Sequence, residues 1–86
     1  MDIVIIESAY KHHISKASIL SCLLNFKNDI VIDDELSKRL FVGFDNMGVA
    51  LEIIAIEDNE RDILLVIHAM KLRKQFYKLL LGEDEL

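Results

Sequence analysis

Short apolar runs separated by polar residues alternate along most of the chain, and they predict a protein dominated by β-strands. The runs are rich in β-branched and aromatic residues, as strands are. The predicted strands are 3–6, 30–32, 39–44, 49–56 and 62–68. Between the third and the fourth, Asp45-Asn46-Met47-Gly48 combines two Asx residues with a glycine and predicts a tight turn.

Three segments follow helical spacing instead. Ser8 is placed to cap a short helical turn over 9–12, and Ser15 is placed to cap a longer helix. The apolar stripe of that second helix is Ile19, Leu20, Leu23 and Leu24. A last helix is predicted over 70–81, with Gly82 as its C-cap and an acidic tail after it.

This order of elements predicts an α+β fold in one domain spanning residues 1–86. Consecutive strands joined by short turns pair antiparallel. We therefore expect a small antiparallel sheet of four to five strands, with two N-terminal helical segments and one C-terminal helix packed against it.

Composition narrows the classes of protein that are compatible with this fold. The net charge is −5, and the single cysteine, Cys22, excludes an intrachain disulfide and a cysteine zinc cluster. The chain starts without the basic stretch of a signal peptide, and its longest apolar run, 63–67, is far shorter than the ~18 residues of a membrane span. We expect a cytoplasmic protein that does not contact membranes.

No GxGxxG, P-loop, HExxH or GxSxG pattern occurs, so no nucleotide cofactor or metal site is expected. The three histidines are the natural candidates for proton transfer, because imidazole titrates near neutral pH. His12 and His13 lie in the predicted bend before the second helix, and His68 ends a predicted buried strand. A helix starting just after His68 would favour a bound anion there. The simpler interpretation of each histidine is a hydrogen-bonded or solvated side chain.

A concentration of positive charge is hidden by the overall acidity. Lys71, Arg73, Lys74 and Lys78 give the predicted last helix a charge of +4 with no acidic residue. Such a helix suits a phosphate backbone or an acidic partner, or it is a solvated face whose lysine stems cover apolar surface. Two carboxylates at strand ends, Glu7 and Asp45, could orient a histidine or an arginine, although turn chemistry explains Asp45 better.

Three segments resemble a known family. Lys11-His12-His13-Ile14-Ser15 is similar to the KHGIS segment of BrnT-type toxins, small ribonucleases of the RelE-like superfamily. A group of short actinobacterial proteins similar to BrnT carries ESAxxHGI, VGxDxxGxLLE and VIHAMxxRxxxxxLL, and the segments 7–14, 42–52 and 66–80 resemble these patterns in the same order, with Ala50 in place of a leucine. His13 stands where that pattern has glycine, so the bend there is expected to be reshaped.

The resemblance implies a type II toxin: a metal-independent endoribonuclease or translation inhibitor, held inactive by a cognate antitoxin, with RNA as substrate and no cofactor. In that interpretation His12 and His68 act as base and acid, Arg73 holds the phosphate, and Glu7 orients His12. The lysines expected to bind RNA are Lys11, Lys71, Lys74 and Lys78.

A different class also fits the residues: a non-catalytic, homodimerising interaction module with a regulatory role. In a helix over 70–81, Lys71, Lys74 and Lys78 would fall on one side. A nuclease would leave that side open beside the histidines, whereas a dimer would cover it. A DNA-binding antitoxin is less compatible, because neither a helix-turn-helix nor a ribbon-helix-helix pattern is present.

Overall fold

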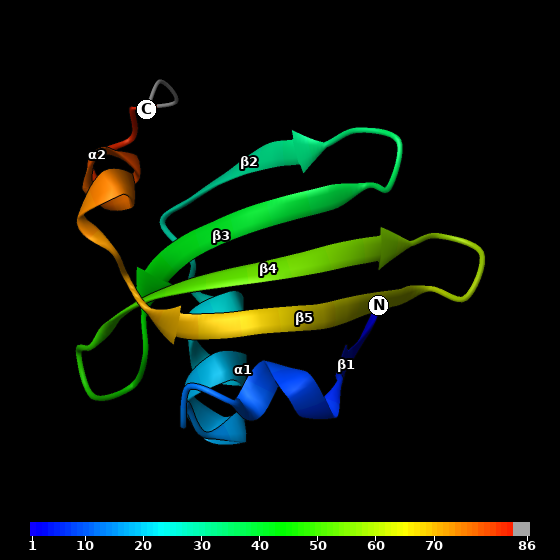
Figure 1. Ribbon diagram of the computed structural model, residues 1–86, viewed down its shortest axis with the longest axis horizontal. Helices are drawn as coiled ribbons and strands as arrows, with labels where there is room; N and C mark the ends of the chain where they lie inside the picture. Colours follow the sequence, from blue (N-terminus) through cyan, green and yellow to red (C-terminus); the bar gives the residue numbers. More distant parts are fainter. Residues whose placement is uncertain (84–86) are drawn as a thin grey trace.

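One five-stranded sheet organises residues 1–83, which are the residues that the computed structural model describes. The strands are β1 (Asp2–Ile5), β2 (Asn28–Asp33), β3 (Lys38–Phe44), β4 (Ala50–Asp58) and β5 (Ile63–Lys71). The helical elements are the 3₁₀ turns η1 (Glu7–Tyr10) and η2 (Lys74–Phe76) and the α-helices α1 (Lys16–Leu24) and α2 (Tyr77–Leu80). The order of the five strands in the sheet is β1-β5-β4-β3-β2, as the ribbon of Figure 1 shows.

The sheet is mixed, which corrects the prediction of a purely antiparallel one. Strands β2 to β5 pair antiparallel through consecutive hairpins, as predicted. Strand β1 lies parallel to β5, with Ile3 opposite Leu64. No short turn joins β1 to β5, since every other element of the sheet lies between them along the chain. Their relative direction is therefore free of the hairpin constraint that decided the other pairs.

The predicted turn at 45–48 is confirmed. The Asp45 carboxylate oxygen Oδ1 accepts hydrogen bonds from the backbone N–H groups of Met47 (2.8 Å) and Val49 (2.9 Å). Gly48 takes a φ of 79°, a conformation that costs glycine nothing. The N–H of Val49, and to a lesser degree that of Met47 and the Ser18 side chain, lower the pKa of Asp45 against a smaller effect of burial. Asp45 thus serves the turn rather than a histidine.

Helix α1 begins where the sequence predicts it. The Ser15 hydroxyl accepts a hydrogen bond from the Ser18 N–H at 3.1 Å and caps the helix. Its buried side is made by Ile19, Cys22 and Leu23, whereas Leu24, which the sequence assigned to the stripe, is 76% exposed. The first helical turn also differs from expectation, because it starts at Glu7 and its N-cap makes no side-chain hydrogen bond, so Ser8 is not a cap.

The predicted helix over 70–81 is wrong. Met70 and Lys71 continue β5 instead, opposite Glu52 and Leu51 of β4, and the Leu72 N–H bonds the Ala50 carbonyl at 3.0 Å. Backbone pairing with a full-length neighbouring strand thereby overrides a weak helical pattern. Only 74–80 is helical, and Gly82, at a φ of 82°, ends it as predicted. The predicted acidic tail begins at Glu83, and its other residues lie outside the described part of the chain.

The two faces of the sheet carry separate apolar clusters. Residues that alternate along β4 divide between them: Leu51, Ile53 and Ala55 pack with α1, whereas Ala50 and Ile54 belong to the cluster on the side of Leu72 and Leu79. Helix α2 is a single short turn, so it covers little of that second face (Figure 1). None of the helices in residues 1–83 is long and apolar enough to cross a membrane.

Candidate functional site

The buried carboxylate of Glu52 is the centre of the site. Glu52 is the third residue of β4, opposite Val42 and Met70, and its exposed fraction is 0%. Among the described residues it is the only polar or charged side chain that is buried. A carboxylate withdrawn from water is costly unless it is paired and hydrogen-bonded, so its partners define what this part of the sheet is built to hold.

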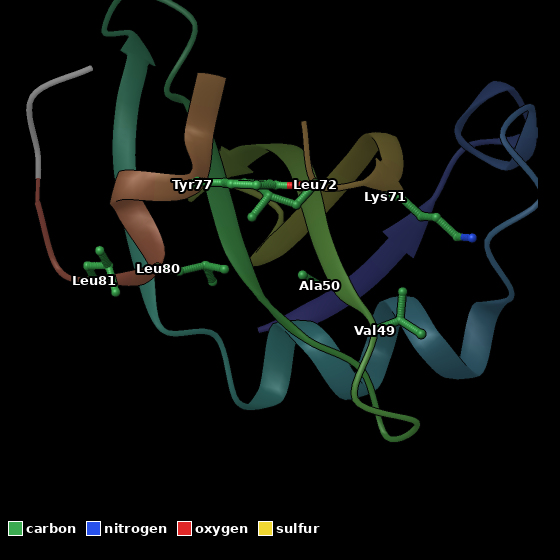
Figure 2. A pocket seen from close by; sticks show the side chains of 7 residues that line it. All are labelled: Val49, Ala50, Lys71, Leu72, Tyr77, Leu80 and Leu81. Carbon is green, nitrogen blue, oxygen red and sulfur yellow. The ribbon is translucent and has the colours of Figure 1, made fainter. Parts of the chain in front are cut away.

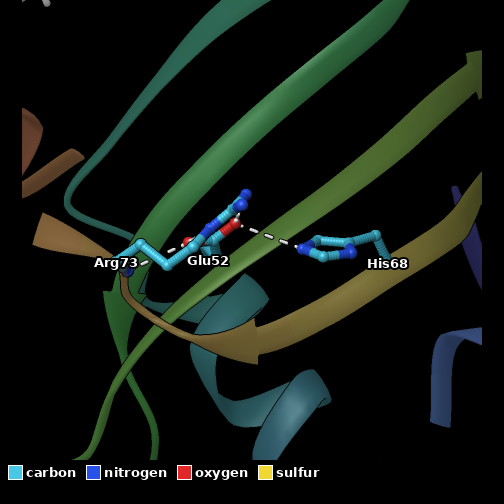
Figure 3. Close-up of polar contacts among 3 residues, drawn as sticks. All are labelled: Glu52, His68 and Arg73. Atoms are coloured by element: carbon cyan, nitrogen blue, oxygen red, sulfur yellow. Dashed lines mark hydrogen bonds and ion pairs between the residues drawn. The ribbon is translucent and has the colours of Figure 1, made fainter. Parts of the chain in front are cut away.

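Arg73 supplies most of the hydrogen bonds that replace water around the buried Glu52 carboxylate. Its Nε donates to Oε1 of Glu52 at 3.0 Å and its Nη2 donates to Oε2 at 2.7 Å, a bidentate pair (Figure 3). The backbone N–H of Arg73 also donates to Oε1, at 3.0 Å. The guanidinium lies 5.4 Å from the centre of the Phe76 ring, and 46% of the Arg73 side chain stays exposed. The arginine therefore covers the carboxylate on one side and meets solvent on the other.

These contacts decide the protonation state of Glu52. Burial raises the pKa of the carboxyl, but the hydrogen bonds from the Arg73 side chain and backbone and from His68, with the Arg73 charge, outweigh it and leave the pKa lowered. The same pairing raises the pKa of the Arg73 guanidinium. Glu52 is thus an anion at neutral pH although it has no contact with solvent.

His68 is the third member of the site. Its Nε2 lies 3.2 Å from Oε2 of Glu52 (Figure 3). A β-bulge makes this contact: Ile54 faces His68 whereas Ala55 faces Val66, so Ile67 is an extra residue in β5. If Ile67 were instead part of a regular, unbulged strand, strict alternation from Val66 would put His68 on the α1 face. The bulge turns the imidazole to the face that carries Glu52.

His12 comes from the opposite end of the chain. It follows η1, which packs against β5. Its ring centre lies 5.6 Å from that of His68, with an angle of 74° between the rings. The neighbouring residue His13 has a φ of 62° and its N–H bonds the Tyr10 carbonyl at 2.9 Å. Position 13 therefore takes the left-handed conformation that favours glycine.

The structure thus brings together three of the four residues proposed for catalysis: His12, His68 and Arg73. Glu7 is exposed at the start of η1, and its side chain makes no hydrogen bond or ion pair within residues 1–83. The carboxylate beside the histidine pair is Glu52, which the sequence reasoning did not select. One signal could have found it: Glu52 is a charged residue inside the otherwise apolar run 49–56.

Two expectations about the basic segment need correction. His68 lies inside β5, which continues to Lys71, so no helix begins beside it and no helix dipole acts on an anion there. Lys71 is a strand residue, whereas Lys74 belongs to η2 and Lys78 to α2, so the three do not form one helical face. These lysines and Lys11, which follows η1, are exposed.

Two other possibilities for chemistry, a reactive cysteine and a metal site, find no support in the structure of residues 1–83. Burial, and to a lesser degree the charge of Asp45, raise the pKa of the Cys22 thiol to about 11, so it is a poor nucleophile at neutral pH. Within residues 1–83, no three histidine, cysteine, aspartate or glutamate side chains are arranged to hold a metal ion.

Comparison of the chain with protein-family models, with curated proteins and with solved structures finds no match. The fold and the site therefore define a small α+β protein with a mixed five-stranded sheet and a buried carboxylate that joins an arginine to a histidine pair.

Proposed function

We propose that this protein is a metal-independent endoribonuclease, acting in the cytoplasm as the toxin of a type II toxin–antitoxin pair. The observation that carries the proposal is the placement of two imidazoles 5.6 Å apart beside an arginine that is anchored on a buried carboxylate. Cleavage of an RNA phosphodiester needs a base, an acid and a cation for the negative phosphorane, and this cluster holds all three types of group.

The Glu52–His68 contact assigns the roles of the two histidines. Because the anionic carboxylate only accepts hydrogen bonds, Nε2 of His68 carries a proton, and in the neutral imidazole Nδ1 then has the free lone pair. His68 is then the base that takes the proton of the ribose 2′-hydroxyl. The 2′-oxygen attacks phosphorus, the bond to the 5′-oxygen breaks, and protonated His12 gives its proton to that leaving oxygen. The products are a 2′,3′-cyclic phosphate and a 5′-hydroxyl.

Arg73 is the residue that we assign to the phosphate. Glu52 engages its Nε and Nη2, and its other terminal nitrogen, Nη1, has no hydrogen-bond partner among residues 1–83. The guanidinium is thereby held in one orientation with donor capacity left for a phosphate oxygen. Lys11, Lys71, Lys74 and Lys78 supply exposed positive charge for the rest of the RNA backbone in this proposal.

RNA cleavage by the purified protein tests the proposal. A short labelled RNA should be cut in the presence of EDTA to a 2′,3′-cyclic phosphate, and a 2′-deoxy nucleotide at the cut position should block the reaction. His12→Ala and His68→Ala should each lower the rate by ~10²–10⁴-fold. His13→Asn is the matched control, because asparagine tolerates the positive φ and His13 is not in the cluster. Equal cleavage by all three variants would contradict the assignment.

A non-catalytic module that dimerises remains the second candidate function. The observation that favours it is the exposure of large apolar side chains after β5, with Tyr77 51% and Leu81 79% exposed. Sedimentation velocity discriminates between the two: a concentration-dependent dimer without RNA cleavage would support the module. A monomer that cleaves RNA would support the nuclease, whose inhibitor would be a cognate antitoxin protein.

A further inference from the structure

An apolar groove lies between α2 and the adjoining ends of β4 and β5, on the sheet face that carries Glu52. Its volume is about 510 Å³, within the range of specific binding sites. It is lined by Val49, Ala50, Lys71, Leu72, Tyr77, Leu80 and Leu81. Figure 2 shows Tyr77 and Leu80 reaching from α2 toward Leu72 and Ala50, with Lys71 on the far side of the groove.

Much of this lining is apolar surface left in contact with water. Tyr77 is 51% exposed and Leu81 79% exposed, whereas Leu72 and Leu79 of the same segment are buried. A contiguous apolar patch with a polar rim is the usual mark of a binding surface in a soluble domain.

The charge around the groove selects its occupant. The segment 70–81 carries +4 in a chain whose total is −5. Arg73 is neutralised by Glu52, whereas Lys71, Lys74 and Lys78 form no ion pair within residues 1–83. Of the nearby acidic residues, Asp45 is engaged by the turn before β4, and Glu83 lies two residues after Leu81. A ligand that fills the groove with apolar groups therefore meets, at its rim, three lysines that form no ion pair within residues 1–83.

Outside the groove, residues 1–83 of a second copy do not offer such a ligand. Helix α1 contains no acidic residue, and the acidic runs at 33–35 and 57–60 span strand ends and the turns after them, without a helical apolar stripe. Each of two copies also carries a net charge of −5, so their overall charges repel. A nucleic acid would match the lysines but would leave the apolar lining unfilled.

We infer that the groove between α2 and the ends of β4 and β5 docks a short amphipathic segment of an acidic partner polypeptide. Its apolar side chains lie on Ala50, Leu72 and Leu80, and its carboxylates approach Lys71 and the lysines of 74–78. The groove adjoins the candidate site, because Leu72 precedes Arg73 and Ala50 is two residues from Glu52 on the same face. Docking there does not depend on the proposed nuclease activity.

Two synthetic peptides test the inference on the full chain. Each carries leucines at helical i, i+3, i+4 and i+7 positions. One is flanked by glutamates and the other by lysines. Titration of the ¹⁵N-labelled protein, followed by amide chemical shifts, detects weak binding and locates it. We expect the glutamate peptide to shift amides of Val49, Leu72 and Leu80, and to bind at least ~10-fold more tightly than the lysine peptide.

Matched substitutions distinguish binding in the groove from non-specific binding of the peptide elsewhere on the protein. Leu81→Asp should weaken binding of the glutamate peptide at least ~10-fold, whereas Leu24→Asp, at a similarly exposed leucine of α1, should leave it unchanged. Lys71→Glu should likewise weaken it, with Lys16→Glu of α1 as control. Equal binding of the two peptides, or shifts outside the groove, would overturn the inference. So would a dimer that Leu81→Asp dissociates, or groove shifts caused by RNA instead of peptide.

Discussion

The Arg73 guanidinium binds both carboxylate oxygens of Glu52, at 2.7 and 3.0 Å, although the two partners differ sharply in exposure. Glu52 has no contact with solvent, whereas nearly half of the Arg73 side chain does. The carboxylate depends on the arginine more than the arginine depends on the carboxylate, because only the buried ion lacks water as an alternative partner.

This asymmetry predicts unequal costs for removing each partner. Arg73→Met keeps the apolar stem but leaves a buried anion with fewer donors, and should lower the free energy of unfolding by about 2–3 kcal/mol. Glu52→Gln keeps the shape and leaves an arginine that water can solvate, and should cost about 1–2 kcal/mol. Urea denaturation of both variants and of the double variant measures these costs.

The double variant is the control for that pair. If the ion pair is the reason, Arg73→Met should cost clearly less in the Glu52→Gln background, with a coupling energy of roughly 1–2 kcal/mol. Strict additivity would contradict the interpretation. The same result matters for activity, because loss of RNA cleavage in an Arg73 variant is informative only where the variant remains folded.

Stability should also fall in acid because of Glu52. Its pKa is lowered in the folded protein, so the unfolded chain binds the proton first as the pH drops. The stabilisation is complete above the ordinary glutamate pKa of ~4.3 and is lost as the pH falls through the lower folded value. Denaturation from about pH 6 to about pH 3 should show a smaller decline for Glu52→Gln than for the parent. The same measurement on Asp45→Asn shows how much of the acid-induced decline comes from Asp45, whose pKa is also lowered in the folded protein.

Gly43 should tolerate no side chain. A Cβ at this position would lie 2.9 Å from Cα of Phe26 and 3.3 Å from the Lys27 nitrogen, because the chain after α1 crosses β3 there. These are backbone atoms and cannot turn aside as a flexible side chain would. Gly43→Ala should therefore lower the free energy of unfolding by about 1–3 kcal/mol, measured by urea denaturation. An unchanged midpoint would mean that the crossing is looser than the structure shows.

Position 13 should prefer glycine to a β-branched residue. His13 has a φ of 62°, a region that costs an ordinary residue about 1 kcal/mol and a β-branched one more. His13→Gly should leave stability equal or raise it by up to ~1 kcal/mol, because relief of strain exceeds or balances the added freedom of the unfolded chain. His13→Val should lower it. Thermal melting compares the two, and RNA cleavage should be retained by His13→Gly.

Local sequence patterns were sufficient for much of the fold. The strands were found because apolar runs are interrupted by turn residues, and the Ser15 cap and the turn at 45–48 were found because their side chains bond to backbone a few residues away. Where a long-range contact decided the outcome, the prediction was wrong. The segment 70–71 became strand because β4 was there to pair with it.

The candidate site divides in the same way. The sequence by itself named His12, His68 and Arg73, through their chemistry and their motifs. Only the tertiary structure selected Glu52 as the shared partner of Arg73 and His68, since a bulge at Ile67 was needed to turn His68 to the face that carries Glu52. Hydrogen bonds between residues a few positions apart can be predicted from the local sequence. Contacts between distant side chains depend on strand register and strand order, which short-range patterns do not determine.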